Sequence, residues 1–132
     1  MNLYFDASAI VALMTAETTA STLAVVVEKA TNSTTSWLSV WEAATAVSRK
    51  TGMTATRELQ SILTFCETGR IEILTENRPI TEAALQAFDR YGRRSGHAAA
   101  LNMGDCFSYA FAKSEGAKML YAGNDFSQID GV

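Results

Sequence analysis

The stretch Asn2-Leu-Tyr-Phe-Asp-Ala-Ser-Ala-Ile-Val-Ala-Leu-Met14 is the best guide to the fold of this chain. Its segment Leu3–Phe5 is apolar without polar alternation, which is typical of a strand covered on both faces. A short helix is expected over residues 8–14, and Asp6 or Ser8 can cap its first turn. A buried strand that leads directly into a helix indicates a sheet packed between helices.

The rest of the chain alternates between helical and strand patterns. Further helices are expected at residues 17–30, 37–50 and 54–68, from Pro79 to about Tyr91, and at 103–115. Strands are expected at 70–74 and 118–122, and the Ser/Thr-rich stretch 31–36 reads as a loop with room for a very short strand. This alternation implies parallel pairing through right-handed crossovers. The predicted fold class is α/β, a three-layer α/β/α sandwich with a central parallel sheet, in one domain over residues 1–132.

Composition limits the class of protein and its compartment. Hydrophobic residues make up 48% of the chain and charged residues 19%, as in ordinary globular proteins. The longest apolar runs are too short to span a bilayer, so no membrane association is expected. The N-terminus has no basic region and Asp6 interrupts its apolar run, so a signal peptide is not expected and the cytoplasm is the predicted location. Cys66 and Cys106 are expected to be reduced, buried thiols.

The residues that the chain lacks exclude several kinds of chemistry. It has one histidine, His97, so zinc sites with two or three histidines cannot form. The Gly-x-Ser-x-Gly, Gly-x-x-x-x-Gly-Lys-Ser/Thr and Gly-x-Gly-x-x-Gly motifs are all missing. Carboxylates remain, and their hard oxygen atoms favour Mg²⁺ or Mn²⁺.

Four acidic residues are isolated among apolar or small neighbours: Asp6, Glu42, Asp105 and Asp125. Asp6 and Asp125 follow predicted strands, whereas Asp105 and Glu42 lie in the first and second turns of predicted helices. Ligands of open α/β sheets bind beyond the carboxyl ends of the strands, so all four side chains can meet there. Carboxylates held together without basic partners nearly require a cation.

Each acid also has an ordinary structural interpretation. Asp6 can cap the following helix, and Asp125 can shape a turn. Asp105 can complement the helix dipole or complete a cap begun by Asn102. On a helical wheel Glu42 points away from the predicted apolar face, so solvent exposure is its default. That face comprises Trp37, Val40, Trp41, Ala44 and Val47. The residues around Glu42 nevertheless lack any compensating charge.

Together the four acids suit a two-metal phosphodiesterase. In such sites one ion activates water and the other stabilises charge on the leaving oxygen, and no histidine is needed. The net charge of −3 gives no broad basic face for nucleic acid. A local basic cluster precedes Asp105, and it is either a solvated loop or helix end or a phosphate-contacting edge. It comprises Arg90, Arg93, Arg94 and His97.

Four segments in this order resemble the PIN domain, and specifically the VapC toxins of type II toxin–antitoxin pairs. The segments are Asp6-Ala-Ser-Ala-Ile10, Trp41-Glu-Ala43, Ala100-Leu-Asn-Met-Gly-Asp-Cys-Phe-Ser-Tyr-Ala110 and Ala117-Lys-Met-Leu-Tyr-Ala-Gly-Asn-Asp-Phe-Ser-Gln128. The resemblance covers essentially the whole chain and also implies an α/β/α sandwich.

The resemblance carries functional implications. The family's catalytic and metal-binding quartet falls on Asp6, Glu42, Asp105 and Asp125, and Ser8 supports the first aspartate. The implied activity is a Mg²⁺- or Mn²⁺-dependent endoribonuclease that cleaves RNA with metal-activated water. Homodimerisation and inhibition by a cognate antitoxin, whose C-terminal segment enters the acidic groove, are implied as well.

The chain departs from the family pattern at one position, and three basic residues are candidates for partner contact. Many relatives have a second acid before the last aspartate, where this chain has Asn124, whose carbonyl oxygen carries no charge and can only support the site. Arg93, Arg94 and His97 are candidates for RNA or antitoxin contact.

Two other functions stay open at this point. One is a phosphatase with Asp6 as nucleophile, although Asp6-Ala-Ser8 lacks the second acid of an Asp-x-Asp signature. The other is a catalytically inactive PIN-like binding module.

Overall fold

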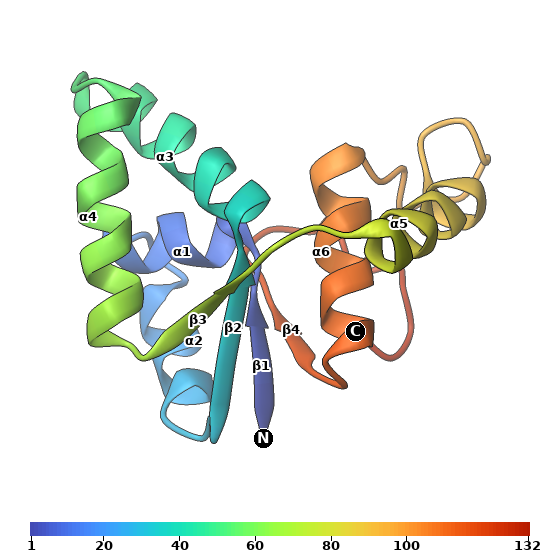
Figure 1. The fold of residues 1–132 in the computed structure, drawn as a ribbon, viewed down its shortest axis with the longest axis horizontal. Helices are drawn as coiled ribbons and strands as arrows, with labels where there is room; N and C mark the ends of the chain where they lie inside the picture. The colour runs from blue at the N-terminus through green and yellow to red at the C-terminus, as the bar shows by residue number, and fades with distance from the viewer.

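Four short strands form one parallel sheet at the centre of the computed structural model, which describes residues 1–132 (Figure 1). Their order across the sheet is β3 (Ile71–Leu74), β2 (Asn32–Ser36), β1 (Asn2–Phe5) and β4 (Lys118–Leu120). In the register, Leu3 pairs with Ser33 of β2 and Tyr4 with Met119 of β4. The predicted parallel sheet is confirmed.

Helices cover both faces of this sheet (Figure 1). One layer contains α1 (Ala7–Met14), α2 (Ala20–Val27), α3 (Trp37–Thr51) and α4 (Ala55–Thr68). The other contains α5 (Arg78–Tyr91) and α6 (Met103–Ser114). Leu3 and Phe5 pack with the first layer, whereas Tyr4 packs with the second and stacks on Phe111. The N-terminal strand is therefore buried on both faces, as its sequence predicts, and the three-layer α/β/α sandwich is confirmed.

The Ser/Thr-rich stretch is a full strand rather than a loop with a very short strand. Residues Asn32–Ser36 form β2, and Thr34, Thr35 and Ser36 are fully buried. The Thr35 hydroxyl donates a hydrogen bond of 2.8 Å to the Phe5 carbonyl of the neighbouring strand. Buried hydroxyls are tolerated when they find such partners, and for this reason a polar sequence can form a central strand here.

The apolar face predicted for the third helix is partly wrong. Trp37 and Trp41 are 45% and 65% exposed. The buried face of α3 instead contains Val40, Ala43, Ala44 and Val47. Small alanine side chains let α3 lie close to α1, and an indole ring does not fit into such a contact.

Three helices begin at the carboxyl edge of the sheet. Asp6 caps α1 immediately after β1, and Ser36, the last residue of β2, caps α3. Asn102 caps α6 and forms a capping box with Asp105. Polar capping groups are therefore concentrated where open α/β sheets bind ligands. None of the helices has the length and apolarity that crossing a membrane requires.

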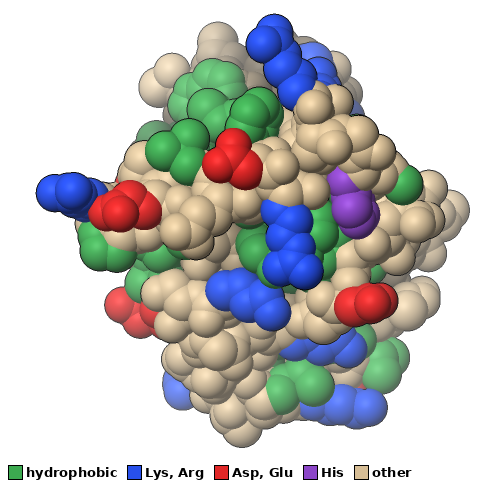
Figure 2. Space-filling model, turned by 90° about the vertical axis from the view of Figure 1, so that its right-hand side faces the viewer, with side chains coloured by type: hydrophobic (Ala, Val, Ile, Leu, Met, Phe, Trp, Pro, Cys, Tyr) green, Lys and Arg blue, Asp and Glu red, His purple; other side chains and the backbone are tan.

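The predicted basic cluster lies at the end of α5 and in the segment that joins it to α6. Basic side chains and the single histidine are visible on the α5–α6 side of the molecule (Figure 2). The His97 ring packs edge-on against the Tyr91 ring with centroids 4.9 Å apart, and Arg90 stacks over the same tyrosine. His97 Nδ1 accepts a hydrogen bond from the Ala99 N–H. Two members of the cluster, Arg90 and His97, therefore pack on Tyr91 at the end of α5.

Candidate active site

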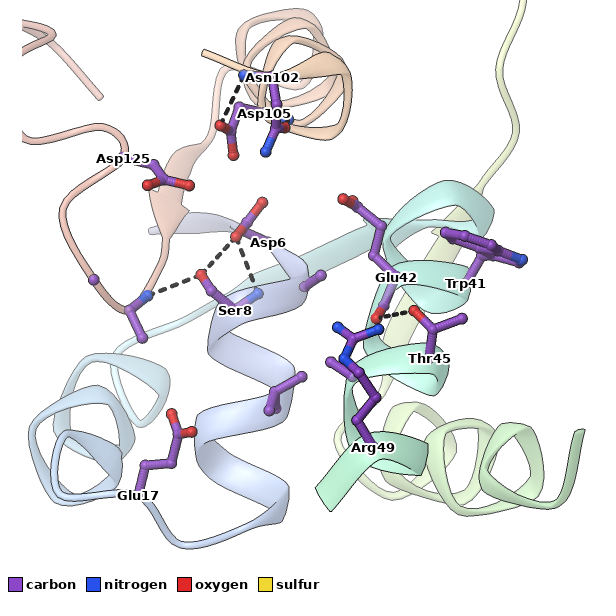
Figure 3. A pocket seen from close by; sticks show the side chains of 15 residues that line it. Asp6, Ser8, Glu17, Trp41, Glu42, Thr45, Arg49, Asn102, Asp105 and Asp125 are labelled. Atoms are coloured by element: carbon purple, nitrogen blue, oxygen red, sulfur yellow. Dashed lines mark hydrogen bonds between the residues drawn. The ribbon is translucent and has the colours of Figure 1, made fainter. Parts of the chain in front are cut away.

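A pocket of about 640 Å³ opens at the carboxyl edge of the sheet. It lies between α1, α3, the start of α6 and the segment after β4 (Figure 3). Its lining includes all four isolated acids: Asp6, Glu42, Asp105 and Asp125. Residues distant in sequence thus bring their carboxylates to one place, as expected from their positions at strand and helix ends.

Asp6 is held by donors on both of its carboxylate oxygens. Oδ2 accepts hydrogen bonds from the Ser8 N–H at 3.0 Å and from the Ser8 hydroxyl at 2.5 Å. Oδ1 accepts a bond of 2.7 Å from the hydroxyl of Ser108 on α6. Ser8 Oγ in turn accepts from the Ala122 N–H, which ties the segment after β4 to this corner. Asp6 is therefore both the cap of α1 and the floor of the pocket.

Asp105 combines a structural and an electrostatic role. Its Oδ2 accepts a hydrogen bond of 3.1 Å from the Asn102 N–H within the capping box. Burial, together with the negative charges of Asp125 and Asp6, raises the pKa of Asp105 to about 7, against the lowering effect of the Asn102 hydrogen bond. The prediction that Asp105 completes a cap begun by Asn102 is confirmed, and the Asp105 carboxylate also lies near Asp125 and Asp6.

Glu42 reaches from α3 toward the acids on the other side of the pocket (Figure 3). Burial, and then the nearby charge of Asp6, raise the pKa of Glu42 to about 7. Its carboxylate lies against Gly104, where any added Cβ would overlap it. Glu42 is therefore half-buried rather than fully exposed, and it lines this pocket beside Trp41 and Thr45 of the same helix.

Asp125 is exposed and follows β4 in a short turn. The adjacent Phe126 is fully buried and anchors this turn in the core beneath. Asn124 is not among the residues that line the pocket, and its backbone carbonyl accepts a hydrogen bond from the Ser127 hydroxyl. Its supporting role stays a prediction.

The sequence matches the family model described as PIN domain over residues 3–132. The chain belongs to the PIN domain family. It is 34% identical to ribonuclease VapC42 of Mycobacterium tuberculosis (strain ATCC 25618 / H37Rv) over 95% of this chain and 93% of that protein. A VapC ribonuclease of Rhizobium meliloti (strain 1021) is 62% identical over a shorter match, covering 36% of this chain and 33% of that protein. The resemblance to VapC-type PIN domains is confirmed.

A solved structure supports the same fold. The crystal structure of Mycobacterium tuberculosis VapC20, described as a toxin that cleaves the sarcin–ricin loop, superposes with a TM-score of 0.76. The superposition covers 98% of this chain and 96% of that one, at 21% sequence identity. At this identity the likeness establishes the PIN fold alone.

The donor set of this PIN domain fits a divalent cation. No three His, Cys, Asp or Glu side chains are preformed as a metal site. Burial is the main cause of the raised pKa values of Glu42 and Asp105, and neighbouring carboxylates add to it; a bound cation would offset both effects. Only oxygen donors are available from these acids, and hard oxygen ligands suit Mg²⁺ or Mn²⁺.

Several residues at the PIN-domain pocket carried no recognisable signal in the sequence. Ser108 is three positions beyond Asp105 and shares its helix face, which is the one hint that could have identified it. Glu17 and Arg49 line the opposite end of the pocket. By contrast, Arg93, Arg94 and His97 do not line it, and their contact with RNA or antitoxin stays a prediction.

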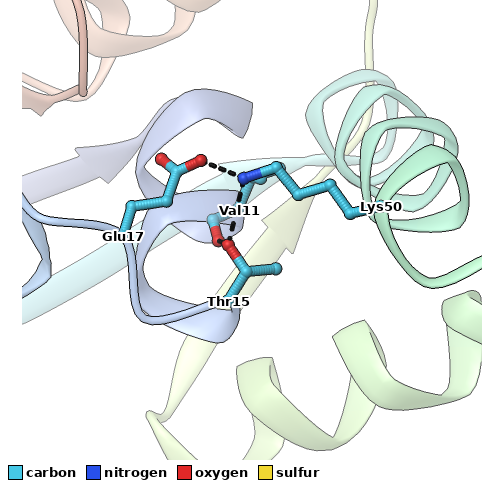
Figure 4. Close-up of polar contacts among 4 residues, drawn as sticks. All are labelled: Val11, Thr15, Glu17 and Lys50. Atoms are coloured by element: carbon cyan, nitrogen blue, oxygen red, sulfur yellow. Dashed lines mark hydrogen bonds and ion pairs between the residues drawn. The ribbon is translucent and has the colours of Figure 1, made fainter.

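Glu17, which lines one end of the pocket, takes part in an ion pair (Figure 4). Lys50 near the end of α3 pairs with Glu17 in the α1–α2 connection. Lys50 Nζ also donates to Thr15 Oγ1, and the Thr15 hydroxyl donates to the Val11 carbonyl. These contacts fasten the α1–α2 connection to α3.

Proposed function

We propose that this PIN domain is a Mg²⁺- or Mn²⁺-dependent endoribonuclease, the toxin of a type II toxin–antitoxin pair. The observation that carries the proposal is the convergence of Asp6, Glu42, Asp105 and Asp125 on one open pocket. The names of the curated relatives, which call them VapC ribonucleases, support the same activity. In this proposal the whole chain, residues 1–132, acts as one domain in the cytoplasm.

The four carboxylates are the proposed metal ligands and catalytic residues. A bound divalent ion would supply the Lewis acidity that activates water and stabilises charge on the leaving oxygen. Asp6 is oriented for ligation by Ser8 and Ser108: Oδ2 accepts two hydrogen bonds from Ser8 and Oδ1 accepts one from Ser108, so Oδ1 keeps a lone pair for a cation. Glu42 and Asp105 would release any proton they hold as the cation binds, because ligation requires the ionised form.

The shape and charge of the pocket also bear on its partners. It is open to solvent and admits an extended strand, which supports single-stranded or looped RNA as substrate. Arg49 lines the same pocket and gives it a cation for a phosphate group. A cognate antitoxin and a second copy of the chain are the proposed protein partners.

Cleavage of RNA by the purified protein tests the proposal directly. We expect cleavage of a mixed RNA pool with Mn²⁺, none with EDTA, and none by Asp6→Asn or Asp105→Asn proteins that remain folded. Activity that survives EDTA or either substitution would contradict the metal-dependent mechanism. Turnover of a phosphomonoester through an aspartyl-phosphate would indicate a phosphatase, and partner binding without any cleavage would indicate an inactive module.

A further inference from the structure

A series of buried hydroxyl groups in contact lies beneath Asp6 and comes from four elements of the fold. Ser108 of α6 donates to Asp6 Oδ1 at 2.7 Å, and Ser39 Oγ of α3 lies 3.4 Å from Ser108 Oγ. Tyr4 Oη of β1 lies 2.9 Å from Ser39 Oγ and donates to Ser36 Oγ at 2.8 Å. All four hydroxyl-bearing residues are fully buried. The pocket floor is therefore hydrogen-bonded from within the core.

This placement is unusual for the interior of an apolar layer. Neighbouring buried positions on α6 hold apolar side chains such as Ala110 and Phe111, and alanine would fill the space at position 108 with a better helix former. A buried hydroxyl is unfavourable unless it is bonded. Ser108 meets that condition only by pointing at Asp6 and Ser39.

Counting hydroxyl hydrogens fixes the direction of the bond to Asp6. The hydrogen of Ser108 goes to Asp6, because an ionised carboxylate can only accept. The hydrogen of Tyr4 goes to Ser36, so Ser39 has one hydrogen to direct at either Tyr4 or Ser108, and only the contact that receives it is a hydrogen bond. Ser108 remains a donor to Asp6 in both arrangements.

We infer that Ser108 is a positioning residue that sets the rotation of the Asp6 carboxylate for cation binding, and that Ser39 supports Ser108 through the contact between their hydroxyl groups. The inference rests on the proposed function. Ser8 acts on Oδ2 from α1 and Ser108 acts on Oδ1 from α6, so neither oxygen can turn without breaking a bond. Partners that hydrogen-bond to a metal-ligating carboxylate typically contribute about 10–100-fold in metal affinity.

Mn²⁺ binding measured by calorimetry on the metal-free protein tests this role without using activity. We expect Ser108→Ala to weaken Mn²⁺ binding about tenfold or more. Ser114→Ala is the matched control, because Ser114 lies exposed on the same helix and makes no side-chain hydrogen bond. It should bind Mn²⁺ like the wild type. Ser108→Thr keeps the hydroxyl and should recover most of the affinity.

Kinetics separate positioning from general stabilisation. For Ser108→Ala the Mn²⁺ concentration that gives half-maximal RNA cleavage should rise, while KM for RNA at saturating Mn²⁺ stays unchanged. A lower melting temperature with wild-type Mn²⁺ affinity would overturn the inference and leave Ser108 a purely structural residue.

A further variant keeps the test decisive if a Ser108 variant does not fold. Should Ser108→Ala or Ser108→Thr be unfolded, Ser39→Ala replaces them, with a smaller loss of Mn²⁺ affinity expected. Unchanged Mn²⁺ affinity in Ser39→Ala would then overturn the inference. If the wild type cleaves RNA and Ser108→Ala binds Mn²⁺ as the wild type does, the role of Ser108 is refuted but the proposed function stands. A wild-type protein that neither binds Mn²⁺ nor cleaves RNA refutes the proposed function itself.

Discussion

The carboxylate of Glu42 on α3 lies directly against the backbone of Gly104 on α6, in the space that a side chain at position 104 would take. The three atoms nearest to a Cβ placed on Gly104 are Oε2, Cδ and Oε1 of Glu42. The backbone of Gly104 is helical, so the position needs glycine for space and not for conformation. The start of α6 thus leaves room for an acid that belongs to another helix.

Gly104→Ala should therefore displace Glu42 while the fold survives. The Glu42 side chain is flexible and can swing away, and alanine in a helix gains about 1 kcal/mol over glycine, so the melting temperature should not fall. RNA cleavage should fall by about tenfold or more, as when the support of a metal ligand is lost. Cleavage rates and thermal melts of the two proteins check this.

A double-mutant cycle tells whether Gly104 acts through Glu42. In a Glu42→Ala background the added methyl group meets no carboxylate, so Gly104→Ala should cause no further loss of cleavage. Additive losses in the two backgrounds would show that Gly104 acts in some other way.

The Lys50–Glu17 ion pair should contribute little to stability. Both side chains are partly exposed, and exposed pairs contribute about 0–1 kcal/mol because water and salt screen them. We expect Lys50→Met to lower the free energy of unfolding by about 1 kcal/mol or less in urea titrations. Lys29→Met on the surface serves as the comparison. A much larger loss in Lys50→Met would mean that the contacts with Thr15 and the α1–α2 connection matter more than the charge pair.

Both cysteines should be unreactive in the folded protein. They are free and buried, as their sequence context predicts. Burial raises the pKa of each thiol to about 11, and the charge of Asp105 adds to the effect at Cys106. A thiol-specific disulfide reagent at pH 8 should therefore label neither residue in buffer and both in denaturant. Rapid labelling of the native protein would show that one of the two sites opens.

The fold was predictable because Leu3, Tyr4 and Phe5 are apolar in succession. A strand covered by helices on both faces needs this pattern, whereas a strand with one face in solvent alternates polar and apolar residues. The convergence of the acids was predictable for a related reason, since Asp6 and Asp105 sit at element ends that a parallel sheet places on one edge.

Other features depended on contacts between elements and left no local trace. Burial of the hydroxyls in β2 relies on carbonyl groups of β1. The exposure of Trp41 follows from how closely α3 approaches α1, and a helical wheel carries no information on that distance. Ser108 acquires its partner from Asp6, 102 positions away in the chain.

The metal-free protein should become less stable as the pH rises through 7. The folded-state pKa values of Glu42 and Asp105 are raised to about 7 from ordinary values of 4.5 and 3.8. At pH values between the ordinary pKa and the raised pKa, the folded state binds more protons than the unfolded state. The stability that these two groups contribute at low pH is therefore lost on going to pH 8. In EDTA the melting temperature should therefore be higher at pH 6 than at pH 8. The side chain of glutamine cannot ionise, so Glu42→Gln should show a smaller difference. A wild-type melting temperature that rises from pH 6 to pH 8 would contradict this electrostatic account.

Added Mn²⁺ should raise the melting temperature more at pH 8 than at pH 6, because at the lower pH the cation must first displace protons from the same carboxylates.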